Sequence, residues 1–88
     1  MRSRIAVVTV SGKAYYWLVN ELNRRRIPFL SLIPGEIIPP SITVVITTKD
    51  ESRLVNHPSV LIYSPDEEPS AIIDEAIRII KNKKLTKS

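Results

Sequence analysis

Eighty-eight residues suffice for one small domain with a single core, and 43% hydrophobic with 25% charged residues is typical of a folded globular chain, not a disordered one. The net charge of +4 suits an acidic partner, while the lack of cysteine excludes disulfides, thiolate catalysis and cysteine-ligated zinc. No apolar run approaches the roughly 18 residues that a membrane helix needs, so we expect a cytoplasmic protein without a membrane partner.

The charges are unevenly distributed along the chain. Residues 1–30 carry six basic groups and one acid, whereas residues 31–80 carry three basic groups and eight acids. Residues 81–88 add four lysines. This asymmetry either steers an acidic partner to one side of the molecule or pairs the two halves with each other. The few thermolabile residues and the many Lys, Arg and Glu residues resemble the composition of a hyperthermophile protein.

The first predicted elements are a buried strand and an amphipathic helix. Residues 4–10 form a nearly continuous β-branched run, which is typical of a strand covered on both faces of a parallel sheet. Ser11 then provides a helix N-cap. From Lys13 to about Arg25 the apolar period becomes helical, and one stripe contains Ala14, Leu18 and Leu22 together with Tyr15 and Val19.

Three further strands and a second helix follow. Pro28 ends the first helix, and prolines bound the loop at 34–40. The predicted elements are strands at 27–33, 41–48 and 60–63, a single helical turn at 51–55, and a last helix from about 69 to 82. We expect one domain over residues 1–84, followed by a frayed basic end at 85–88.

The order β-α-β-β-turn-β-α predicts an α/β fold with two main helices. Because a strand-helix-strand unit makes a right-handed parallel crossover, and because the first and third strands have the most buried patterns, we expect a small, mostly parallel four-stranded sheet in the order 2-1-3-4. The loop at 34–40 could span about 23 Å when extended, enough to cross the sheet. If it does not cross, the third strand is antiparallel and the fold is α+β.

The turn between the first predicted strand and helix is a candidate anion site. It consists of Ser11, Gly12 and Lys13, and it lies at the carboxyl end of a central strand, where ligands bind in open α/β sheets. The free N–H groups of the helix start and the Lys13 ammonium would favour a small anion or a nucleotide phosphate. A capped helix start without a ligand explains the same residues, because the turn holds one glycine where a dinucleotide-binding loop has three.

The outer face of the first predicted helix is aromatic and basic. It carries Lys13, Trp17, Asn20 and Arg24, with Tyr16 at its border, and the helix ends in Arg24, Arg25 and Arg26. An exposed Trp between cations is typical of a platform on which nucleic-acid bases stack, and it is equally typical of a protein interface or a homodimer contact. A third alternative is that Trp17 packs inside the domain, on the 34–40 loop or the last helix, while the arginines complement the helix dipole.

The sequence contains few residues of the types that carry out catalysis. His57, the only histidine, lies in a predicted surface turn and has no second histidine for a metal. Asp50 and Glu51 follow the third predicted strand and are the best placed acids for a metal ion or a hydroxyl. The acids at 66–68 and 74–75 are predicted to lie in solvent at the last helix, without the enclosed site that paired carboxylates need. We therefore expect no enzymatic activity, no cofactor and no metal.

Three segments resemble a known family. Residues 6–16, 28–32 and 44–48 look like an uncharacterised archaeal family whose longer members resemble predicted nucleases of RNase H-like fold. The resemblance covers nearly the whole chain but only the amino-terminal part of those nucleases, so no residue here would inherit their metal-binding acids. It implies a non-catalytic accessory domain or a stand-alone relative. The expected function is therefore binding, either to nucleic acid or to a protein partner, with a small anion as the least favoured ligand.

Overall fold

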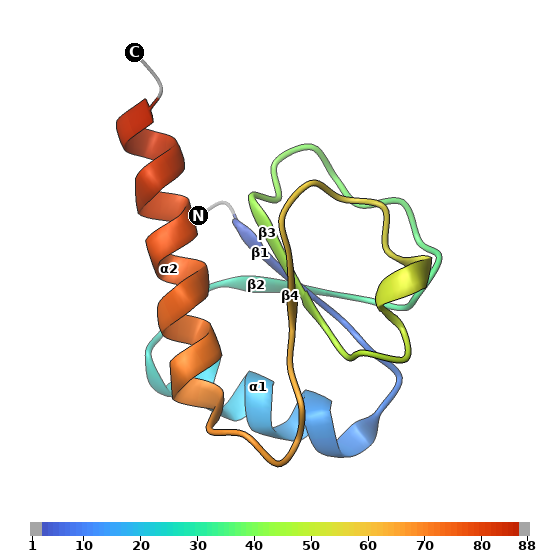
Figure 1. Cartoon of the computed structure of the whole chain (residues 1–88). Coiled ribbons are helices and arrows are strands. Elements are labelled where there is room, and N and C mark those ends of the chain that lie inside the picture. The colour runs from blue at the N-terminus through green and yellow to red at the C-terminus, as the bar shows by residue number, and fades with distance from the viewer. Residues whose placement is uncertain (1–2, 87–88) are drawn as a thin grey trace.

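The computed structural model describes residues 3–86, with side chains described as far as Asn82. Figure 1 shows the elements in chain order. They are β1 (Ile5–Val8), α1 (Gly12–Arg24), β2 (Phe29–Leu32), β3 (Val44–Thr47), the 3-10 turn η1 (Ser52–Leu54), β4 (Val60–Ile62) and α2 (Pro69–Thr86). Within this part of the chain, no helix is both long and apolar enough to span a bilayer.

The four strands form one sheet in the order β2-β1-β3-β4, and every neighbouring pair is parallel. The central strand β1 pairs Ile5 with Phe29 on one side and with Val44 on the other. This confirms the predicted α/β class, strand order and number of main helices. The alternative with an antiparallel third strand is wrong, because the link after β2 does cross the sheet.

The handedness of the crossovers explains which face each connection covers. From β1 to β2 the chain steps in one direction through α1, and from β2 to β3 and on to β4 it steps in the opposite direction. Right-handed crossovers in opposite directions must lie on opposite faces of the sheet. The links at 33–43 and 48–59 therefore cover one face, while α1 covers the other and is joined there by α2.

Alternate residues of each strand supply two hydrophobic clusters, one on each face. On the helical face, Ile5, Val7, Val44 and Ile46 pack with α1 and α2 residues. On the opposite face, Ala6, Val8 and Val45 pack with Ile42 and with partly buried residues of the two links. Both faces of β1 and β3 are thus buried, as their continuous apolar runs predict.

The observed strands are shorter than predicted, and α2 is longer. The ladder of β1 ends at Val8, so Val10 falls outside the sheet and is 72% exposed. The helix α2 continues to Thr86, which places Leu85 and Thr86 of the predicted frayed end inside it. Lys87 and Ser88 lie outside the described residues.

The carboxyl end of α1 is closed by a Schellman arrangement. The N–H of Ile27 donates to Leu22 O at 2.9 Å, and the N–H of Arg26 donates to Asn23 O at 3.0 Å. Arg26 accordingly adopts a φ of 57°, a conformation that favours glycine. Ile27 at the next position packs on the helical-face core. The helix therefore stops at Arg24, and the Arg triplet spans its last residue, its cap and the turn beyond.

Candidate functional site

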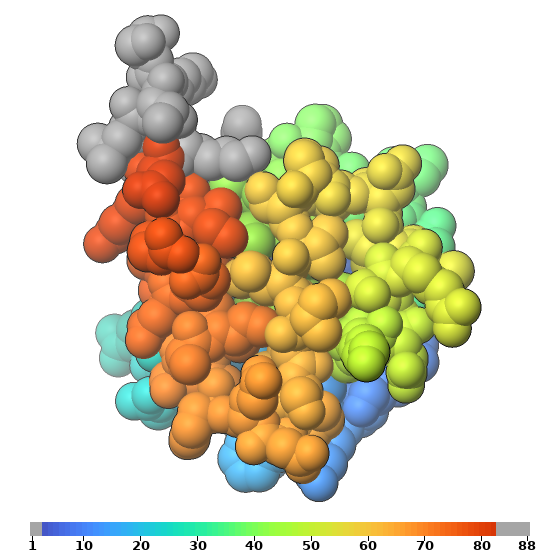
Figure 2. All heavy atoms as spheres, in the orientation of Figure 1, coloured from blue at the N-terminus to red at the C-terminus, as the bar shows by residue number. Residues whose placement is uncertain are grey.

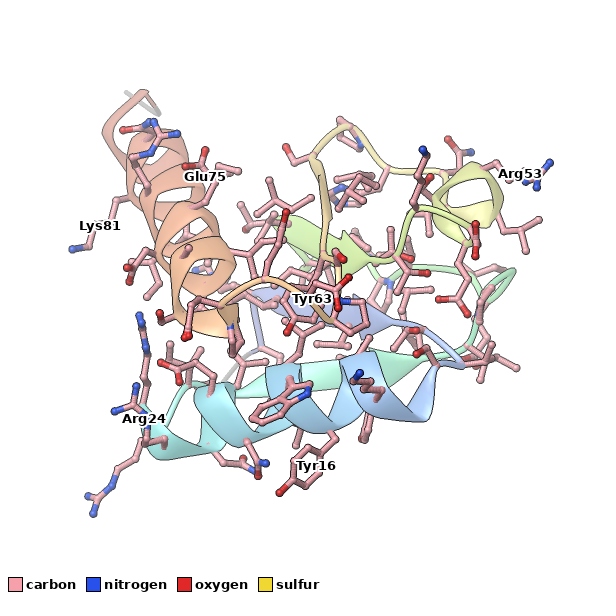
Figure 3. The ribbon with its side chains drawn as sticks, turned by 60° about the horizontal axis from the view of Figure 1, so that its bottom comes forward. Tyr16, Arg24, Arg53, Tyr63, Glu75 and Lys81 are labelled. Carbon is pink, nitrogen blue, oxygen red and sulfur yellow. The ribbon has the colours of Figure 1, made fainter. Side chains whose placement is uncertain are left out.

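The two faces of α1 differ sharply in burial. Ala14, Leu18 and Leu22 are fully buried against the sheet. On the outer face all the predicted residues are exposed, namely Lys13, Tyr16, Trp17, Asn20 and Arg24. Figure 3 shows Tyr16 and Arg24 projecting from α1 away from the sheet. The structure thus brings the predicted residues together on one continuous helix face.

Two aromatic rings form the centre of this outer face. The ring centroids of Tyr16 and Trp17 lie 5.4 Å apart in an edge-to-face arrangement at 74°. Tyr16 is 59% exposed and Trp17 42% exposed. The neighbouring Tyr15, predicted within the apolar stripe, lies at the border instead and shares a 2.9 Å hydrogen bond with the Ser31 hydroxyl. A large part of the Trp17 ring therefore remains available to a binding partner.

The Arg triplet divides into two paired residues and an exposed one. Arg24 and Arg25 both contact the carboxylate of Glu21, and each makes a 2.6 Å ion pair with it. Arg25 also pairs with Asp74 at 2.6 Å and donates to Ser70 O, so it joins α1 to α2. Arg26 follows in the turn with an exposed side chain. Arg25 thus links two helices of the fold. This role depends on Asp74, which lies 49 positions later in the chain.

Glu21 is the buried member of this cluster, with only 8% of its surface exposed. Hydrogen bonds from the Arg24 and Arg25 side chains hold the pKa of Glu21 below its ordinary value, against the opposing effect of burial. Glu21 therefore stays negatively charged beneath the end of α1. It pairs with two of the three arginines to which a phosphate would otherwise bind.

A second buried carboxylate lies at the carboxyl ends of β1 and β3, where the direction of the crossovers reverses. Glu51 is 9% exposed and accepts a 2.7 Å hydrogen bond from the Val10 N–H and a 2.8 Å bond from the Thr48 hydroxyl. The Thr9 side chain also favours the charged form of the same carboxylate. Burial by itself raises the pKa of Glu51, but these hydrogen bonds outweigh it and the pKa is lowered.

Glu51 explains what happens at the predicted anion site. Ser11 caps α1 by accepting from the Ala14 N–H at 3.4 Å, Gly12 faces open space, and Lys13 is exposed. The N–H just before them, that of Val10, already binds a negatively charged group of the protein itself. Within the described residues, the anion that this turn binds is therefore the Glu51 carboxylate, which comes from the segment after β3.

Stability is expected to fall in acid because of these two carboxylates. A folded pKa below the ordinary value of 4.5 means that the unfolded chain binds more protons as the pH drops. The stabilisation is fully present above the unfolded pKa and is lost as the pH falls through the folded pKa. The guanidinium midpoint should therefore be level near pH 6–7 and decrease from about pH 5 downward. A midpoint that stays constant to pH 3 would contradict this assignment.

The edge formed by the carboxyl ends of β3 and β4 holds a shallow hollow of about 360 Å³, lined in part by Lys49, Asp50 and Ser64. Asp50 is exposed there, while Glu51 turns away to β1. Within the described side chains, no group of three or more His, Asp or Glu residues is arranged to hold a metal ion. In the structure the Glu51 carboxylate binds a hydroxyl of the protein itself, that of Thr48.

His57 joins the start of β4 to the segment before β3. Its position in a predicted surface turn did not indicate this contact. Its Nε2 lies 3.1 Å from Ile42 O, and its Nδ1 accepts from the Ser59 N–H at 3.0 Å. The ring is half-buried and connects the start of β4 to the crossover that precedes β3. Its contact with Ile42 is 15 residues away in the chain, so no local pattern could reveal it.

Comparison with known proteins identifies the architecture. Residues 4–80 match the family model described as a response regulator receiver-like domain. No curated protein and no solved structure matches the chain. The resemblance to the amino-terminal domain of RNase H-like nucleases is wrong. The segments that suggested it are mainly strands β1, β2 and β3, whose apolar residues serve the same packing role in any parallel sheet.

Proposed function

The chain belongs to the response regulator receiver-like family, and on that premise we propose that it is a non-catalytic signalling or interaction domain whose α1 outer face binds a protein partner. Receiver-like domains mediate protein interactions and are in general not enzymes. The proposal goes beyond the family in naming the binding surface, which we call the α1 outer face and define as Lys13, Tyr16, Trp17, Asn20 and Arg24, with Arg26 in the turn that follows.

The observation that carries the proposal is the exposed pair of Tyr16 and Trp17 on a well-anchored helix. Interfaces obtain most of their binding free energy from a few large aromatic or Arg side chains. Tyr16 and Trp17 are already held against each other at a ring distance of 5.4 Å. Because their orientation is set before binding, a partner would lose little side-chain entropy in covering them.

The charges around these rings favour a protein over a nucleic acid. Binding of a phosphate backbone depends on several free cations in a row. Arg25 is engaged by Glu21 and Asp74, and Arg24 shares the same Glu21 carboxylate. The exposed cations Lys13 and Arg26 lie at opposite ends of α1. An interface with an aromatic centre and polar ends is typical of protein recognition.

The test is selection of binders from a phage-displayed random peptide library on the whole wild-type chain. Selected peptides should bind Trp17→Ala at least about 10-fold more weakly, since truncating a hot-spot side chain costs about 2 kcal/mol or more and about 1.4 kcal/mol is tenfold. The matched control is Leu54→Ala, which removes a 59% exposed apolar side chain elsewhere and should leave affinity unchanged. Circular dichroism would verify that both variants are folded.

Two results would contradict the proposal. Peptides that bind wild type and Trp17→Ala equally would place recognition on another surface. Quenching of Trp17 fluorescence by a twelve-residue oligothymidylate, with an affinity that decreases steeply as salt increases, would assign the face to single-stranded nucleic acid. Because Trp17 is the only tryptophan, the fluorescence signal reports on this face alone.

A further inference from the structure

The edge of β4 that faces away from β3 has backbone N–H and C=O groups that point out of the sheet. Toward β3, the Val45 N–H donates to Ser59 O and the Tyr63 N–H donates to Thr47 O. In a parallel ladder, alternate residues face the same neighbour. The intervening Leu61 therefore also faces β3, and the N–H and C=O groups of Val60 and Ile62 point outward. Such a row is a template for another strand.

In the part of the chain that the structure describes, β4 is an edge strand of the sheet. The common doubly wound order 2-1-3-4-5 places a fifth strand next to the fourth, whereas here the order stops at β4. Figure 2 shows residues of β4 as a column on the surface of the molecule, between α2 and the segment around η1. Ile62 is 45% exposed in this column.

We propose that a second copy of this chain pairs with β4 in antiparallel fashion across a two-fold axis, which joins two sheets into one of eight strands. The proposal rests on the interaction role inferred above and uses a different surface. A two-fold axis beside β4, at the level of Leu61, places Val60 opposite Ile62 of the partner subunit. Both positions have outward backbone groups, so about four hydrogen bonds would form.

Apolar side chains flank this edge on both faces of the sheet. Val60 packs on the face opposite the helices, and Ile62 shares its side of the strand. On the helical face, Ile72 and Ile79 lie two turns apart on one side of α2. That side is opposite Asp74, which contacts α1, so it faces the β4 edge. In the pair of copies, Ile72 of one would approach Ile79 of the other.

Charge complementarity argues for a second copy in this orientation. The acids Asp66, Glu67 and Glu68 are exposed just beyond the carboxyl end of β4. The helix α2 then runs back along the strand, and its last turns, which are basic in sequence, lie at the level of the amino end of β4. An antiparallel pair therefore brings the acidic loop of each copy toward the lysine-containing turns of the other. A parallel neighbour would place acid beside acid.

The first test is sedimentation equilibrium of the full chain. Wild type should show a concentration-dependent dimer that dissociates as salt increases. Ile62→Pro removes one outward N–H but leaves the β3–β4 ladder intact, because proline is tolerated on an edge strand whose N–H faces solvent. It should be monomeric, with at least a 10-fold weaker association. Ile62→Ala keeps the N–H and should weaken association less, and Trp17→Ala should dimerise as wild type does.

A cross-linking test does not depend on the proline variant folding. The natural chain has no cysteine, so single cysteines can be placed cleanly. In an equimolar mixture of Val60→Cys and Ile62→Cys, the disulfide heterodimer should predominate, since hydrogen-bonded antiparallel pairs lie about 5.5 Å apart, within disulfide range. A monomer at all concentrations, or cross-linking no faster than that of an Arg53→Cys control, would overturn the proposal. Loss of peptide binding with an intact dimer would instead contradict only the α1 assignment.

Discussion

Glu51→Ala is expected to lower the free energy of unfolding by about 3 kcal/mol. The substitution removes the acceptor for the Val10 N–H and for the Thr48 hydroxyl, and it leaves these donors without that partner at a largely buried position. For a domain of this size, such a loss corresponds to a decrease in the melting temperature of roughly 10 °C or more. Thermal and guanidinium unfolding, followed by far-ultraviolet circular dichroism at pH 7, would measure it.

Glu51→Gln provides the control for this result. The amide retains one oxygen acceptor and nearly the same shape, so its loss of stability should be clearly smaller than that of alanine. It should also weaken the decrease of stability between pH 5 and pH 3, because one of the two carboxylates with a lowered pKa is gone. Equal stability of wild type and the alanine variant would mean that Glu51 does not join β1 to the segment after β3.

Leu18→Ala is expected to cost a similar or larger amount, about 3–4 kcal/mol. Leu18 is fully buried on the inner face of α1, within the cluster that contains Ile5 and Ile73. Truncation loses the transfer free energy of three carbon atoms and leaves a cavity between α1, the sheet and α2. Guanidinium unfolding of both proteins, analysed with the same dependence of the free energy of unfolding on denaturant concentration, would give the difference in stability.

Tyr16→Ala is the matched control on the opposite side of the same helix. Tyr16 is 59% exposed, so its removal should change the free energy of unfolding by less than about 1 kcal/mol. The contrast between positions 16 and 18 separates the face of α1 that maintains the fold from the face proposed to bind. If Tyr16→Ala were as destabilising as Leu18→Ala, the aromatic pair would be part of the core and would not be a binding surface.

Much of the α1 outer face could be predicted from the sequence, because helical periodicity relates residues three and four apart without knowledge of the rest of the chain. The buried stripe at Ala14, Leu18 and Leu22 determines which side chains point outward. The same local reasoning could not show that Arg25 is engaged. Its partner Asp74 comes from a helix 49 residues later, and an Arg triplet alone looks equally suited to phosphate.

The amino-acid sequence by itself determined the α/β class, the order of the strands and the inner and outer faces of α1. These features depend on alternation, period and crossover handedness, which are local or nearly universal. Only the tertiary structure decided the partners of Glu51, Arg25 and His57 and the outward direction of the Val60 and Ile62 backbone groups. Each of these depends on strand register and on contacts between distant segments, and many combinations of those contacts are compatible with one pattern of apolar and polar residues.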